Sequence, residues 1–328
     1  MLKFPHRRKF LRLAAGAAAL PTVSHVVAWA QSYPTRPVRI VVGLAAGSSS
    51  DILARLIGQR LSERLGRPVI IENRPGAGGS LGAESVVRAT PDGYTLLLCS
   101  SADAVNTTIY DNLKFNFARD IAPVASIARG PLVLVVHPSF PAKAVPEFIA
   151  YAKANPGKIS FGSAGIGTVA QMAGELFKVM AGVDLIHVPY RGLGPALTDL
   201  LGGQVQAIFS TTPPAIEHIK AGRLRGLAVT SAMRDETLPD LPTIGDFLPG
   251  YEATLMTGLG APGHTPAEII ERLNKEVVTA LVDTGIKAKL AELGNAPLAM
   301  TPADFGKLIA DETEKWAKVI RAANIKAQ

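Results

Sequence analysis

Hydroxyl and glycine residues gather in the segment GLAAGSSSD, residues 43–51, directly after the apolar run VRIVV. The apolar residues that follow recur on one face of a helix, so the segment leads a strand into a helix. Backbone N–H groups at a helix N-terminus bind anions, and three consecutive serines add hydroxyl donors. No lysine follows Gly47, as a P-loop requires, and the G-x-G-x-x-G spacing is missing, so a carboxylate fits better than a nucleotide. The alternative is that Ser50 or Asp51 only caps the helix.

The same arrangement recurs in KISFGSAGIGTVAQMAGELF, residues 158–177. A short strand pattern again runs through small residues into a helix pattern, with Ser163, Gly165, Gly167 and Thr168 at the turn. Ligands of α/β sheets collect beyond the carboxyl ends of strands, at such turns. Two loops of this kind therefore predict a ligand held in a cleft between two domains.

A third stretch, ENRPGAGGSLGAE, has a tight turn at Pro75–Gly76 and glycines at 78 and 79 that permit close backbone approach. It reads equally well as an ordinary strand-to-helix connection. Tyr190 and Arg191 could reach a cleft, although hinge or surface roles are favoured for both. The lone Cys99 lies in an apolar run and is predicted to be a buried strand residue.

Signatures of catalysis are poor. The chain contains no G-x-S-x-G elbow, no H-E-x-x-H motif and no cysteine pair for zinc, so no metal site is expected. The histidines after residue 30 are widely spaced and are predicted to be structural or surface residues: His137, His187, His218 and His264. We therefore expect a protein that is not an enzyme and needs no cofactor.

The N-terminus resembles a bacterial twin-arginine export signal, because Arg7 and Arg8 precede an Ala-rich apolar run and Ala28-Trp29-Ala30 forms a small-x-small cleavage site. Residues 1–30 are thus predicted to be removed after Ala30, although a membrane anchor is the alternative. The signal holds five of the 34 basic residues and no acidic one, which leaves 29 basic against 27 acidic residues and a net charge near +2. The formal +7 of the whole chain therefore does not indicate a nucleic-acid partner.

Strand and helix patterns alternate along the rest of the chain, which predicts an α/β fold with mostly parallel sheets flanked by helices. One βαβαβ run ends near residue 100, and a second begins at LVLVVHP, residues 132–138. From TGLGAP, residues 257–262, the chain is mostly helical, with helices predicted over 266–283 and 302–323 and with Thr265 and Thr301 as N-caps. We expect two lobes: a discontinuous first lobe, residues 31–131 plus 255–328, and a second lobe, residues 132–254.

Several blocks together resemble the Bug-type receptors, the periplasmic solute-binding proteins of tripartite tricarboxylate transporters. The most distinctive are ENRPGAGGSLGAE and HVPYRGLGPALTDLLGGQV, and the others include DILAR, DGYTLL, FGSAGIGT, LPDLPTIGDF and TEKWAKVIRAANIK, in order along the chain. The resemblance implies a type II-like periplasmic-binding-protein fold, a small carboxylate ligand in the cleft between the lobes, and membrane components of such a transporter as partners. A periplasmic monomer is expected.

The resemblance also implies the ligand-binding residues, which come from the first loop, the glycine hairpin, the start of the segment after the third strand, and the second lobe. The full set is Ala46, Gly47, Ser48, Ser49, Ser50, Asp51, Ala77, Gly78, Ser101, Ala164, Gly165, Thr168 and Ser210. Some of these contacts are expected to run through ordered water.

Three departures from the family pattern bear on the ligand. The first loop is commonly PFAPGGSTD in the family and is GLAAGSSSD here; Gln171 stands in a region where many members have histidine; and Ser210 replaces an aspartate that can hold an ammonium group. These departures favour a mono-, di- or aromatic carboxylate over an amino acid. A sensory module that signals to a membrane kinase and an exported hydrolase or isomerase remain the alternative functions.

Overall fold

The computed structural model describes residues 33–110 and 113–326, so the predicted export signal lies outside the described residues. The strands of the described part are β1 (Val38–Val42), β2 (Val69–Asn73), β3 (Thr95–Ser100), β4 (Ile121–Val136), β5 (Ser160–Ser163), β6 (Ile186–Pro189), β7 (Ala207–Thr211), β8 (Arg225–Val229), β9 (Thr254–Pro262) and β10 (Ala296–Pro297). The α-helices are α2 (Ser49–Leu65), α3 (Ser80–Val87), α4 (Ser101–Ile109), α5 (Phe117–Asp120), α6 (Val145–Ala154), α7 (Val169–Ala181), α8 (Leu193–Leu201), α9 (Thr212–Lys220), α10 (Ala267–Leu281), α11 (Thr284–Glu292) and α12 (Pro302–Ala322), with short 3-10 turns η1 (Ala77–Gly79) and η2 (Ile244–Asp246).

The first lobe is built on the sheet that contains β1. Strands β2, β1 and β3 are parallel neighbours in that order, which is the predicted βαβαβ succession, and β9 continues the sheet in the antiparallel direction beside β3. Helix α2 begins directly after β1 and packs on the sheet, because Leu53, Ile57 and Leu61 recur at helical spacing and are almost fully buried. Helix α10 joins the same core.

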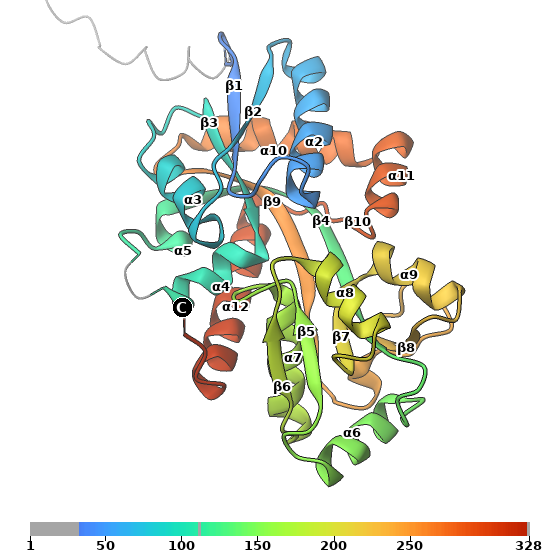
Figure 1. The fold of residues 1–328 in the computed structure, drawn as a ribbon. Coiled ribbons are helices and arrows are strands. Elements are labelled where there is room, and N and C mark those ends of the chain that lie inside the picture. Colours follow the sequence, from blue (N-terminus) through green and yellow to red (C-terminus); the bar gives the residue numbers. More distant parts are fainter. Residues whose placement is uncertain (1–32, 111–112, 327–328) are drawn as a thin grey trace, which may run out of the picture.

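The second lobe has a sheet of its own, in which β5 is parallel to both β6 and β7. Helix α7 covers this sheet with a buried face, and its Phe177 packs against Phe209 of β7, with ring centroids 5.9 Å apart. The two-lobed α/β architecture expected from the sequence is confirmed, and Figure 1 shows the lobes one above the other.

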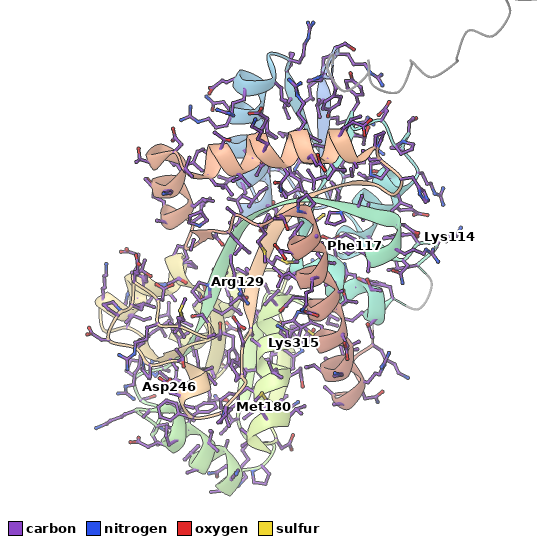
Figure 2. All side chains as sticks on the ribbon, turned by 180° about the vertical axis from the view of Figure 1, so that it is seen from behind. Lys114, Phe117, Arg129, Met180, Asp246 and Lys315 are labelled. Carbon is purple, nitrogen blue, oxygen red and sulfur yellow. The ribbon has the colours of Figure 1, made fainter. Side chains whose placement is uncertain are left out.

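Strand β4 connects the two sheets. Its residues 121–131 pair with β9 in the first sheet, and from Leu132 onward it pairs with β7 and β8 in the second (Figure 1). The chain returns from the second lobe to the first beside β4. Just before β9 begins, the Ala253 N–H donates to the Thr230 carbonyl, which follows β8. Arg129 of β4, labelled near the centre of Figure 2, joins β4 to the returning chain. It forms an ion pair with Glu252 and a hydrogen bond to Thr254 Oγ1 at 2.7 Å.

Several elements differ from the sequence predictions. The sequence predicts no helix within residues 101–120 or 284–292, yet α4, α5 and α11 form there. Thr301 caps α12 as predicted, accepting from the Asp304 N–H at 3.1 Å. Thr265 does not cap α10: its hydroxyl donates to the Pro262 carbonyl at 2.7 Å, and Pro266 occupies the N-cap position. Cys99 is buried on β3 as predicted.

The cores of the two lobes are not wholly separate. Trp316, Val319 and Ile320 of α12 belong to the same buried cluster as Phe161 and Phe177 of the second lobe. Helix α12 also packs along α4 (Figure 1). No described helix is both long and apolar enough to cross a lipid bilayer.

Candidate functional site

The first loop leads from β1 into α2 and holds six of the predicted ligand-binding residues. Ser48 is the N-cap, and its hydroxyl accepts from the Asp51 N–H at 3.3 Å. The Asp51 carboxylate turns back and accepts from the Gly47 N–H at 2.9 Å. Ala46, Gly47 and Ser49 are exposed and Ser48 and Ser50 are half-buried, whereas Asp51 is buried beneath them. The loop therefore presents the free N–H groups of the helix start to the outside, with Asp51 as its internal brace.

The second loop leads from β5 into α7 and repeats this construction. Thr168 is the N-cap, and its hydroxyl accepts from the Gln171 N–H at 3.3 Å. The Gln171 amide oxygen accepts from the Gly167 N–H at 2.8 Å. Ala164 and Gly165 are half-buried on the approach to this turn.

Each loop thus places a glycine, a hydroxyl N-cap and, four residues after the glycine, a side chain that closes back onto the glycine N–H. Gly47 and Gly167 both adopt the left-handed conformation, with φ of 82° and 78°. The closing residue is charged in one lobe and neutral in the other. The two loops, Gly47–Asp51 and Gly167–Gln171, thus share one backbone construction, one in each lobe, and we call them the cradles.

The charge of Asp51 is largely neutralised within the first lobe. Its carboxylate accepts from Arg55 Nε at 3.0 Å and from Asn73 Nδ2 at 3.0 Å, in addition to Gly47. The Arg55 guanidinium is the main reason why the pKa of Asp51 is lowered to about 2, and the Gly47 and Asn73 hydrogen bonds add to it. Asp51 is therefore ionised at neutral pH, and Arg55 compensates its charge.

The glycine hairpin lies beside the first loop. Gly43 and Gly79 approach so closely that a Cβ on Gly43 would stand 2.7 Å from the Gly79 backbone. Ala77 and Gly78 are exposed at the tip of the hairpin, and the Gly78 carbonyl accepts from Asn106 Nδ2 at 2.8 Å. Asn106, on α4, was not singled out from the sequence. No local pattern marks it, because its partners are distant in the chain.

Two of the predicted ligand residues use their hydroxyls within the protein. Ser101 is buried at the start of α4, and its Oγ accepts from the Met256 N–H of β9 at 2.7 Å. Ser210 is buried on β7, and its hydroxyl donates to the Thr211 carbonyl at 2.9 Å. Ser101 directly follows β3 and Ser210 is the next-to-last residue of β7, and both hydroxyls have partners within the protein.

Ser163 and His187 form a close pair beneath the second loop. Ser163 Oγ lies 2.6 Å from His187 Nε2 and accepts from the Gly165 N–H at 3.1 Å. Burial, with a contribution from Lys178, lowers the pKa of His187 to about 4, so the ring is neutral at pH 7. Ser163 is fully buried, and its hydroxyl holds the second loop through Gly165.

A cavity of about 550 Å³ lies elsewhere, between the β4–β9 crossing, the segment 231–237 and the α11–β10 connection. It contains none of the predicted ligand residues. Among the described residues, no three His, Cys, Asp or Glu side chains stand close enough together to hold a metal ion.

The sequence matches a known family over most of its length. The family model described as "Tripartite tricarboxylate transporter family receptor" matches residues 53–325. Protein BugT of Bordetella pertussis is 36% identical over 300 residues, which cover 90% of this chain and 92% of that protein. A relative from Agrobacterium vitis is 38% identical over 96% of this chain and 91% of its own length.

Solved structures agree with these sequence matches. The structure described as "R. palustris Rpa4515 with adipate" is 38% identical, covers 90% of this chain and 99% of that one, and superposes with a TM-score of 0.78. MatC from Rhodopseudomonas palustris, with bound malate, is 32% identical over 88% of this chain and all of its own, with a TM-score of 0.74.

Proposed function

Because the chain belongs to the tripartite tricarboxylate transporter receptor family, we propose that it is a periplasmic receptor that captures a small carboxylate between its two lobes. The observation that carries the proposal is the pair of equivalent anion cradles, Gly47–Asp51 and Gly167–Gln171, one in each lobe. A ligand that contacts both cradles stabilises the closed arrangement of the lobes, because only that arrangement lets it satisfy both sets of N–H donors.

The chemistry of the cradles favours a carboxylate. The N–H groups at the starts of α2 and α7 lack helical partners, and Ser49 adds an exposed hydroxyl. Each charge-assisted hydrogen bond of this kind contributes about 1.5–3 kcal/mol. Cradles in both lobes suit an acid with a second polar end, and the adipate and malate in related structures support a dicarboxylate.

The proposal includes the location of the mature protein and its partner in the membrane. We place the mature protein in the periplasm after twin-arginine export and cleavage behind Ala30, on the pattern of residues 1–30. There the monomer delivers its ligand to the membrane components of a tripartite tricarboxylate-type transporter. The division of the lobes at 131/132 and 254/255 is supported by the change of pairing partner along β4.

The proposal is tested by titrating mature protein, residues 31–328, with mono-, di-, tri- and aromatic carboxylates and with amino acids, using calorimetry and thermal shift. We expect one class of acid to bind, to raise the melting temperature with increasing occupancy, and to be recovered unchanged. Failure of every acid to bind protein stripped of ligand by unfolding and refolding, or recovery of a chemically altered acid, would contradict a carboxylate receptor.

Substitutions in the two cradles test whether the ligand binds there. Ser49→Ala removes one exposed hydroxyl and is expected to weaken binding by about 10- to 100-fold without a change in melting temperature. Thr168→Ala is expected to weaken binding similarly and also to cost about 1 kcal/mol of stability, because Thr168 caps α7. Ser139→Ala, in an exposed turn of the second lobe, is the control and should bind normally. If both cradle variants bind as the control does, the ligand lies elsewhere.

A further inference from the structure

The side chain of Asn106 lies where the hairpin of the first lobe and the cradle of the second lobe come together. It projects from α4 and is almost completely buried, with 3% of its surface exposed. One end of its amide meets the hairpin, and the other end faces the second loop. The two contacts come from segments that lie about thirty residues before and about sixty residues after Asn106 in the chain.

On the side of the first lobe, Asn106 Nδ2 donates to the Gly78 carbonyl at 2.8 Å. Gly78 has a φ of 64°, and a Cβ added to it would stand 2.9 Å from the same Nδ2. Glycine is therefore required here for two reasons, its left-handed backbone and the closeness of the amide.

On the side of the second lobe, the amide faces Gly167, whose N–H is held by Gln171. A Cβ added to Gly167 would stand 3.3 Å from Asn106 Oδ1 and 3.6 Å from the Ile109 side chain. Gly167 is buried in this position. The second cradle thus rests directly against α4, with no side chain of its own in between.

Helix α4, which carries Asn106, is held firmly by its own contacts. The Asp103 carboxylate accepts from the Ser100 N–H at 2.7 Å at the start of the helix, and Ser101 accepts from the Met256 N–H of β9. Ala104 and Val105 are fully buried. Because α4 is held in this way, the length of the side chain at position 106 determines how closely the second cradle can approach the hairpin.

We propose that Asn106 is a positioning residue that sets the distance between the cradles of the two lobes and thereby selects the chain length of a dicarboxylate. This inference rests on the proposed carboxylate function. Asn106 acts through the two loops and not by contacting the carboxylate ends of the acid. A longer side chain at 106 holds the cradles further apart and favours longer acids, whereas a shorter one favours shorter acids.

The test compares dissociation constants for succinate, glutarate, adipate and suberate in wild type, Asn106→Gln and Asn106→Ser, by calorimetry. A single methylene alters recognition by about tenfold or more. We expect the ratio of affinities, adipate over succinate, to rise about tenfold in Asn106→Gln and to fall by a similar factor in Asn106→Ser. Changes of this ratio in opposite directions in the two variants support the proposal. If only one variant folds, its ratio relative to wild type is sufficient.

The matched control is Asn274→Gln. Asn274 is also an asparagine that donates to backbone carbonyls, those of Val124 and Met300 at 2.9 and 3.0 Å, but it lies on α10 within the first lobe. It is expected to lower the melting temperature and leave the chain-length ratio unchanged. Unchanged ratios in the Asn106 variants, with wild type binding normally, overturn the inference and leave the receptor function intact. Absence of binding of any acid by wild type overturns both.

Discussion

At the scale of single residues, Asp51 and Gln171 perform the same task with different charges. Each accepts from the N–H of the glycine four residues before it, at 2.9 and 2.8 Å. Asp51 needs Arg55 and Asn73 to compensate its burial, whereas neutral Gln171 has no such requirement. The two cradles are thus equal in geometry and differ in how strongly their stability depends on pH.

Replacing Asp51 by Asn is expected to lower the free energy of unfolding at pH 7 by about 2 kcal/mol. The pKa of Asp51 is lowered from 3.8 to about 2 in the folded protein, so its ionised form stabilises the fold above pH 3.8. That contribution is lost as the pH falls from 3.8 toward 2. Urea unfolding at pH 7 and at pH 2.5 should show a large difference between wild type and variant at the first pH and a small one at the second. An equal difference at both pH values would contradict the ionic role.

Replacing His187 by Gln should reduce the loss in free energy of unfolding between pH 7 and pH 4.5. The pKa of His187 is lowered from 6.5 to about 4, so the folded protein binds fewer protons than the unfolded chain between these values. The contribution of His187 is therefore present above pH 6.5 and declines as the pH falls to 4. Urea unfolding at pH 7 and pH 4.5 should give a smaller loss of stability for the variant, because the Gln side chain has no proton to gain. The same loss in both proteins would assign the decline to other groups.

The two strand-to-helix loops could be predicted because each is encoded locally, as an apolar strand followed by small residues and an amphipathic helix. Asn106 could not be, because its importance depends on Gly78 and Gly167 meeting it from elsewhere in the chain. Ser101 and Ser210 illustrate the same limit. Their residue type suits a ligand site, but which neighbour takes the hydroxyl is a matter of packing.

At the scale of elements, the close packing of α7 on β5 depends on a glycine. Gly174 faces the ring of Phe161, and a methyl group added there would overlap that ring. Alanine is normally favoured over glycine inside a helix by about 1 kcal/mol. Overpacking typically costs about 1–3 kcal/mol, so it outweighs the gain here.

Gly174→Ala is therefore expected to destabilise the protein by about 1–2 kcal/mol. Gly194 on α8 is the control, since a Cβ there meets nothing within 4 Å, and Gly194→Ala should leave stability unchanged or raise it slightly. Thermal unfolding of both variants checks the pair. A stabilising effect of Gly174→Ala would show that Phe161 moves aside without cost.

The helices and strands with strong periodicity were predictable, and those without it were not. Strand β4 shows the difficulty, since Pro123, Gly130 and Pro131 interrupt its pattern and only its last residues read as a strand. The proline positions are tolerated where the pairing with β9 shifts register or ends. Helix α4 is short and carries polar residues, and its stability comes from packing against α12 and not from its own pattern.

At the scale of the whole molecule, α12 packs in the cores of both lobes. Its first half packs in the first lobe through Phe305 and Ile309, and its second half contributes Trp316 to the core of the second. Loss of either lobe would expose part of this helix. We therefore expect the protein to unfold in one transition despite its two sheets.

Trp316→Ala should remove that coupling. A buried tryptophan replaced by alanine costs about 3–5 kcal/mol. We expect calorimetry to show a single transition for wild type and two for the variant, with the second lobe melting first. Phe305→Ala, at the other end of the helix, is the control: it should lower the melting temperature of the whole protein but keep a single transition, because Trp316 still joins the lobes. A single transition in the tryptophan variant would mean that the β4 crossing alone couples the lobes.

The position of β9 also governs the order in which the molecule can be completed during synthesis. This strand lies between β3 and β4, yet it begins at Thr254, more than 150 residues after β3 ends. While a ribosome is still translating the second lobe, the apolar strand β3 has an open edge, and open edges recruit foreign strands. The lobe that emerges first is therefore the last to close, because its sheet has no partner at the edge of β3 until β9 has been made.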